Sequence, residues 1–315
     1  MAKTTELAAA LTLQQPSRWA GFLETVGTLW RTLQRDKVAM VSLFFLIALC
    51  LSAVFAEQIT PFDPTKQSVW TRLTQPTWVP EQGAFPHILG TDQLGRDILS
   101  RVIFGSRISI IVGTSTVFLA AIVGIGLGLI SGFYSSKIDD LIMAFANVQM
   151  AFPGMLLALS VMTILGPSLE NMIWVLALNN WMLYCRLARG MMLSLREVPF
   201  VDAARVVGGS DARIIWRHCF PNMLSPFITL SVLEVARMIL AEASLSFLGF
   251  GVQPPTPAWG LMLADGRGYV TVAWWLVTFP GIMIGITVLA VNLVASWLRT
   301  VTDPYQRYKL LNQMV

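Results

Sequence analysis

The chain has 315 residues, of which 55% are hydrophobic and only 13% are charged. Soluble globular proteins carry about 25% charged residues, so this composition excludes an ordinary soluble domain and indicates an integral membrane protein. The net charge of +4 arises from basic residues in loops beside apolar segments, which argues against nucleic acid as a partner. The three cysteines form no C-x-x-C pair and the two histidines lie far apart, so no metal site is predicted.

The first apolar segment predicts an uncleaved transmembrane helix. Residues 1–37 are polar and basic, and residues 38–55 (VAMVSLFFLIALCLSAVF) then run without a charge. As a helix this run is roughly 27 Å long, enough to cross a bilayer core. A signal peptide is the alternative, but the polar lead is too long for its basic region. The segment up to residue 104 is rich in proline and balanced in charge, so 38–104 is expected to form the first span and an external loop.

Five further apolar segments bring the expected number of transmembrane helices to six. The second span contains Gly113, Gly124, Gly126 and Gly128, which are expected to let neighbouring backbones approach closely, and Pro153 predicts a kink in the third. The fourth is the weakest, since Asn179 and Asn180 interrupt it, and it should face other helices rather than lipid. The five segments lie near 107–134, 141–165, 172–187, 226–250 and 273–298.

An even number of spans places both termini on the same side of the membrane. The side that holds the N-terminal segment 1–37, the loop 197–222 and the tail 301–315 carries the excess of lysine and arginine. The positive-inside rule therefore assigns this side to the cytoplasm. Residues 105–300 are expected to form a five-helix core that includes this loop.

The loop 197–222 has the pattern of a helix–turn–helix between two spans. Pro199 suits a first helical turn, and Gly208 can adopt the left-handed backbone that ends a helix. Ser210 is placed to cap a second helix, which Pro221 is expected to end. From these residues alone, an amphipathic connector lying on lipid headgroups is as acceptable a reading as a docking surface.

The spacing of this loop resembles the EAA loop of ABC-importer permeases. Asp202-Ala203-Ala204, three residues, Gly208, nine residues and His218-x-Phe220-Pro221 match that pattern, although Asp, His and Phe replace Glu, Ile and Leu. Two further segments, 87–113 and 243–263, look like signatures of C-type permeases of the dipeptide/oligopeptide/nickel group. The end of the last span departs from that group, because Ala295-Ser296 replaces Gly-Asp and Thr300 replaces Asp.

The resemblance implies that the EAA loop docks on separate ATPase subunits as a coupling helix. ATP and Mg would then be bound by those partners, and this chain needs no cofactor of its own; indeed it contains no P-loop sequence. A second homologous permease, two ATPase subunits and an extracytoplasmic substrate-binding protein are the implied partners. The residues assigned to ATPase coupling are Asp202, Ala203, Ala204, Arg205, Gly208, Gly209, Ser210, Asp211, Arg213 and Pro221.

Polar residues within or near the spans are candidates for the translocation path, because a charge in the bilayer usually faces water or a bundle interior. They are Asn147, Gln149, Glu234, Arg237 and Glu242, and the apolar Met150 beside Gln149 is a further candidate. The alternative is structural: Glu234 and Arg237 can lock spans together as an ion pair. Asp92, Arg96 and Asp97 are candidates for an external contact with the binding protein, or else for an internally paired loop. Trp259 is expected to anchor the chain at the membrane interface.

The sequence therefore predicts an all-α integral membrane protein of the type I ABC importer permease fold, in a bacterial inner membrane. The expected function is passage of di- or oligopeptides, driven by ATP hydrolysis in partner subunits. Nickel or another small solute is the alternative cargo. A secondary transporter driven by an ion gradient is the alternative mechanism, and it would require two symmetric halves with broken helices. An intramembrane hydrolase would require a paired nucleophile and base, and the sequence offers no such pair.

Overall fold

The computed structural model describes residues 27, 30–77 and 86–302, and this part of the chain is all-helical, with no β-strand beyond one isolated bridge between Thr91 and Asp97. Most of the predicted N-terminal segment 1–37 and tail 301–315 lies outside the described residues. In chain order the helices are α3 (Lys37–Val54), α4 (Ala56–Ile59), α5 (Ile98–Tyr134), α6 (Lys137–Met150), α7 (Gly154–Leu165), α8 (Leu169–Leu195), α9 (Pro199–Val206), α10 (Asp211–Arg213), a π-helical segment (Ile214–Cys219), α11 (Phe220–Phe247), α12 (Trp259–Gly266), a 3-10 turn (Arg267–Tyr269) and α13 (Trp275–Thr302).

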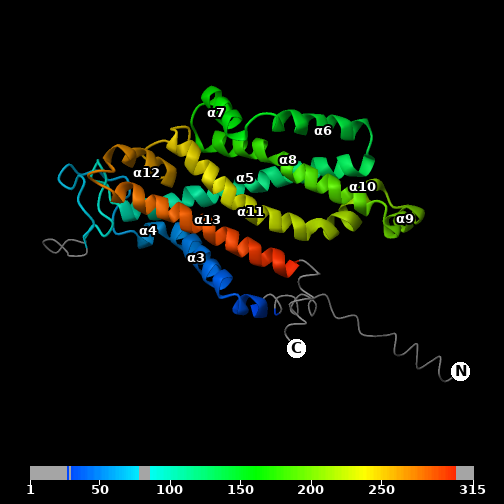
Figure 1. Ribbon diagram of the computed structural model, residues 1–315, viewed down its shortest axis with the longest axis horizontal. Helices are drawn as coiled ribbons and strands as arrows, with labels where there is room; N and C mark the ends of the chain where they lie inside the picture. Colours follow the sequence, from blue (N-terminus) through cyan, green and yellow to red (C-terminus); the bar gives the residue numbers. More distant parts are fainter. Residues whose placement is uncertain (1–26, 28–29, 78–85, 303–315) are drawn as a thin grey trace, which may run out of the picture.

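The long helices lie side by side in an elongated bundle (Figure 1). Helices α9 and α10 lie at one end, called here the α9 end, while α12 and the loops before α5 lie at the opposite end, called the loop end (Figure 1). Within the described residues, four helical segments are long and apolar enough to cross a membrane: α3, α5, the run from α10 through α11, and α13. The pair α6–α7 makes a fifth if the two are taken as one broken span.

The predicted count of six spans is thus matched in part. Helix α8 has 27 residues and is long enough to cross, but it is not among the sufficiently apolar helices, since it carries Asn179, Asn180, Arg186 and Arg189. This is the segment that the sequence marks as weakest. The side of the membrane on which each terminus lies therefore stays a prediction.

The predicted kink at Pro153 is confirmed, and it is a full break. Helices α6 and α7 meet at an angle of 88°, and Pro153 is the residue immediately before α7. Because proline has no N–H to continue the hydrogen-bond ladder, the chain ends one helix and begins another at this point.

Two helices begin earlier than predicted. Helix α5 starts at Ile98, nine residues before Arg107, because the Asp97 carboxylate accepts a hydrogen bond from the Ser100 N–H at 2.8 Å. The charge of Arg107 is accommodated inside this helix, since its Nε donates to the Ala53 carbonyl at the end of α3 and its Nη1 to Glu57. The helix containing α11 begins at Asp211 rather than near residue 226.

The centre of the bundle is a close parallel contact between α5 and α8. Three glycines of α5 at every fourth position, Gly124, Gly128 and Gly132, face Tyr184, Ala188 and Met192 of α8 at the same spacing. A Cβ added at Gly128 would lie 2.3 Å from the Cys185 carbonyl oxygen, and one at Gly124 would lie 2.2 Å from that of Trp181. The absence of side chains lets the two backbones touch, as in other membrane helix pairs.

We expect Gly124→Ala and Gly128→Ala to destabilise the chain by about 1–3 kcal/mol, because the new methyl group overlaps backbone atoms of α8 and forces the helices apart. The measurement is the melting temperature in detergent, read from the amount of protein that still elutes as a single species in size-exclusion chromatography after heating. Gly126→Ala is the matched control, since a Cβ at Gly126 meets no atom within 4 Å. Equal melting temperatures for all three variants would contradict this account of the helix contact.

Candidate coupling surface and translocation path

Helix α9 lies on the surface of the α9 end and is held by one buried face. Val201 is fully buried against Ile214, Cys219 and Met223. Pro199 stands in the first turn, as predicted. The opposite face of α9 is exposed and carries Asp202, Ala203, Arg205 and Val206, while Ala204 is half-buried. The predicted coupling residues of the first helix are therefore displayed together on an exposed face.

The predicted turn after α9 is confirmed, and it depends on glycine. Gly208 has a φ of +83°, a left-handed conformation that residues with a side chain rarely adopt. The Gly209 N–H donates to the Ala204 carbonyl at 2.9 Å and closes the end of the helix. Ser210 then precedes α10 as its N-cap residue, although its side chain makes no capping hydrogen bond. The side chains of Asp211 and Arg213 follow on the exposed surface.

The expectation that Pro221 ends the second helix is wrong. The chain continues from α10 through a π-helical segment into α11 as one helical run of 37 residues. The Phe220 N–H donates to the Ile215 carbonyl, five residues back, so the hydrogen-bond pattern widens just before the proline. A wider turn is one way in which a helix passes a residue that lacks an N–H. The coupling turn is therefore continuous with a membrane-embedded helix.

The α9 end also exposes apolar side chains. Val206 and Val207 are 87% and 88% exposed, and Trp216 is 55% exposed. Val206 and Val207 directly follow Arg205, whose guanidinium pairs with the Asp202 carboxylate at 3.1 Å. A mixed patch of this kind, apolar and rimmed with charge, is typical of a surface that another protein covers.

Two of the three predicted path residues near the α6–α7 break fasten α6 to α8. The Asn147 Oδ1 accepts a hydrogen bond from Arg186 at 2.6 Å, and the Gln149 Oε1 accepts one from the Trp181 Nε1–H at 2.7 Å. Met150 makes no such link, and its side chain is exposed. In this structure the two amides serve the packing of the broken span.

The polar residues of α11 fall into two groups. The Glu234 carboxylate is buried and accepts hydrogen bonds from Asn180 of α8 and from Arg237, both at 2.9 Å. The Arg237 side chain, in contrast, is 66% exposed. Glu242 is completely buried and accepts hydrogen bonds from Ser109 of α5 and from Ser246. Glu242 thus links two helices, while Arg237 faces outward.

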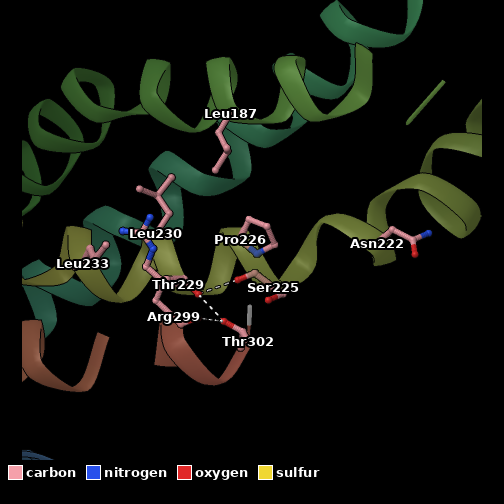
Figure 2. Close-up of a pocket in the computed structure, with 9 residues that line it drawn as sticks. All are labelled: Leu187, Asn222, Ser225, Pro226, Thr229, Leu230, Leu233, Arg299 and Thr302. Carbon is pink, nitrogen blue, oxygen red and sulfur yellow. Dashed lines mark hydrogen bonds between the residues drawn. The ribbon is translucent and has the colours of Figure 1, made fainter. Parts of the chain in front are cut away.

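A cleft of about 600 Å³ opens beside α11, toward the α9 end (Figure 2). Leu187 of α8 borders one side, and Arg299 and Thr302 of α13 border the other (Figure 2). The Thr302 Oγ1 lies 3.4 Å from that of Thr229, which ties the end of α13 to α11. The remaining lining comes from α11: Asn222, Ser225, Pro226, Thr229, Leu230 and Leu233.

At the loop end the predicted external residues are buried and paired within the loop scaffold. The Arg96 Nε lies 2.6 Å from the Asp92 carboxylate, and Asp97 caps α5 and contacts His87 Nδ1 at 2.8 Å. All three predicted residues are 3% exposed or less. Of the two readings of this loop, the geometry has the features of an internally paired scaffold. A direct contact of these side chains with a binding protein stays a prediction.

Two residues that the sequence did not single out complete this scaffold. Arg101 of α5 is fully buried, and Asp265 of α12 lies within 3.7 Å of Arg101 and 3.4 Å of Arg96. Trp259 was expected at the membrane interface, but it is fully buried and its Nε1–H donates to the Val102 carbonyl at 2.9 Å. The sequence could have pointed to Arg101 through its charge, four residues after Asp97 in a largely apolar helix. It could not have identified the partner, because Asp265 lies 164 residues further along the chain.

Comparison with known proteins places these features in a family. Residues 124–308 match the family described as the binding-protein-dependent transport system inner membrane component, and residues 27–76 match the N-terminal TM domain of oligopeptide transport permease C. A di/tripeptide transport system permease protein of Pseudomonas aeruginosa is 40% identical over 87% of this chain and 90% of its own length. A glutathione transport system permease protein of Escherichia coli is 39% identical over 87% of this chain and 89% of its own.

The fold has a counterpart among solved structures. A chain of the MetNI methionine ABC transporter, solved in an inward-facing conformation, superposes with a TM-score of 0.52 at 15% sequence identity. The match covers 64% of this chain and 97% of that one. At this identity the likeness concerns the fold alone.

We expect Glu242→Ala to destabilise the chain by about 3 kcal/mol, because it leaves the hydroxyl groups of Ser109 and Ser246 without their acceptor and opens a cavity. Glu242→Gln keeps an acceptor oxygen and the side-chain volume, so a loss of less than half that size is expected. Thermal denaturation in detergent measures both. If the alanine variant is as stable as the parent, Glu242 does not hold α5 and α11 together.

Proposed function

Since the chain belongs to the family of binding-protein-dependent transport system inner membrane components, as a C-type permease of the peptide ABC importers, we propose that it forms half of a translocation pathway for di- and oligopeptides. The observation that carries the choice of cargo is the 39–40% identity, over 87% of the chain, to permeases named for di/tripeptide, dipeptide and glutathione transport. Glutathione is itself a tripeptide, so these cargoes share one chemistry. None of these three relatives is named for nickel, the alternative cargo.

The second half of the pathway comes from a homologous permease, and an extracytoplasmic binding protein delivers the peptide. Both termini and the α9 end face the cytoplasm of a bacterial inner membrane, and the loop end faces outward. This orientation rests on the excess of lysine and arginine in the segments assigned inside. In this arrangement the core 105–300 carries the path, and the loop within 38–104 presents the outer surface that Asp92, Arg96 and Asp97 hold in shape.

The EAA loop is the contact with the ATPases, which bind ATP and Mg and hydrolyse the nucleotide. Three observations support this assignment: the exposed face of α9, the glycine turn at Gly208 and the apolar patch of Val206 and Val207. Ala203 has the smallest side chain that an L-residue can present, so a groove can approach the helix closely at this position. The charged groups of Arg205, Asp211 and Arg213 are exposed in α9 and α10 and can pair with the rim of such a groove.

The experiment that tests the function is reconstitution into proteoliposomes. The complete complex with ATPases and binding protein should take up a labelled tripeptide only when ATP is present. Complexes without ATPase subunits should show no uptake above empty vesicles, with or without a proton or sodium gradient. Gradient-driven uptake by the permease pair alone would replace the importer with a secondary transporter.

We expect Ala203→Glu to abolish co-purification of the ATPase subunits and to lower ATP-dependent uptake at least tenfold, because a long charged side chain would stand between α9 and its groove. Pull-down of the tagged permease and uptake in proteoliposomes measure the two effects. Ala203→Ser at the same exposed position is the control, and it should retain both. Normal co-purification with Ala203→Glu would remove α9 from the ATPase interface.

A further inference from the structure

One stripe of α11 joins the cleft to Arg237; Pro226 and Arg237 are exposed on it, and Leu230 and Leu233 are half-buried. Pro226, Leu230 and Leu233 line the cleft, and Arg237 follows at the next helical step. The spacing of four, three and four residues keeps all of these positions on one face of a helix. Arg237 therefore lies on the same face as the cleft, one turn beyond its last lining residue.

This position is unusual for a charge. Arg237 lies inside an apolar helix, ten residues before its end at Phe247, yet its side chain is 66% exposed. Exposure of an arginine to lipid at the centre of a span costs about 2.5–3.5 kcal/mol, and such residues face water or other protein instead. The exposed face of α11 is therefore a wet or partner-lined face in the assembled transporter.

The neighbours of Arg237 fix its guanidinium and leave one edge free. Asn180 of α8 holds one carboxylate oxygen of Glu234, and the other oxygen accepts the Arg237 Nη1–H at 2.9 Å. Glu234 is buried and therefore well positioned. The Nε and Nη2 groups of Arg237 have no hydrogen-bond partner within the described residues. These two donors form the edge of the guanidinium that binds a carboxylate in bidentate fashion.

Resting on the proposed function, the geometry points to Arg237 as a binding site for the terminal carboxylate of the peptide in transit. The free Nε–Nη2 edge takes the carboxylate, and the apolar stripe of Pro226, Leu230 and Leu233 lies alongside the adjoining residues of the peptide. A carboxylate is the group that free peptides of any sequence share. One arginine can therefore recognise many cargoes without reading their side chains.

The test compares two forms of one probe, a tripeptide with a photo-reactive benzophenone side chain and either a free carboxylate or an amide at its C-terminus. Labelling of the permease is measured in nanodiscs that contain the complete membrane complex without its binding protein, so selection by that protein does not contribute. The parent complex should be labelled about tenfold more by the free acid than by the amide. Arg237→Met should reduce this ratio to about one.

Two matched variants separate recognition from structure. Arg237→Lys keeps the charge but lacks the planar fork, so an intermediate ratio is expected. Arg267→Met removes an exposed arginine at the loop end and should leave the ratio unchanged. An unchanged ratio in Arg237→Met, or no preference for the acid in the parent, would overturn the carboxylate site. Loss of the second permease from the Arg237→Met complex would overturn it as well, and would assign Arg237 to the subunit interface.

Peptide uptake by the same complexes distinguishes a failure of the Arg237 site from a failure of the proposed transport function. If the parent complex takes up no peptide with ATP and binding protein present, the proposed function fails. If it takes up peptide while labelling ignores the terminal carboxylate, only the site at Arg237 fails.

Discussion

The backbone contact between α5 and α8 is the constraint on which the other features depend. Gly124, Gly128 and Gly132 let α8 lie against α5 at a distance that no larger residue permits. This contact brings a helix rich in polar groups into the bundle, where each such group needs a partner. Asn180 thereby reaches Glu234, and Arg189 binds the Asp139 carboxylate with two hydrogen bonds of 2.6 Å. A helix too polar for lipid is stabilised because the bundle supplies its partners.

The charged side chains at the loop end are buried in ion pairs, whereas Arg237 in α11 is exposed. At the loop end Arg96 and Arg101 are buried between Asp92 and Asp265, so α5 and α12 are fixed together. Pairs of this kind specify a geometry more than they add stability, since burial of each charge is costly. Arg237 differs, because its partner is buried while its own side chain is exposed. The contrast distinguishes a group that holds the structure from one that is available to a ligand.

The continuity of the helix from Asp211 to Phe247 connects the α9 end with the cleft. The π-helical segment lets the chain pass Pro221 without a break, so the coupling turn and Arg237 belong to one helical run. In the coupling that we propose, a displacement of the turn by an ATPase would be passed along this run to the wall of the cleft. The residues that we propose for coupling, from Asp211 onward, and for peptide binding, at Arg237, therefore lie on one helical run.

The membrane class, a kink at Pro153, the turn at Gly208 and, through its spacing, the resemblance to peptide permeases could all be predicted from the sequence. These are local properties, set by apolar run length or by the backbone preference of one residue. The folded structure was needed to show that Asn180 donates a hydrogen bond to Glu234, that Asp265 pairs with Arg101 and that Trp259 is buried. Each of these depends on residues more than 50 positions apart, and their meeting is fixed by helix packing that no local pattern encodes. The same packing left the guanidinium of Arg237 exposed beside its buried partner.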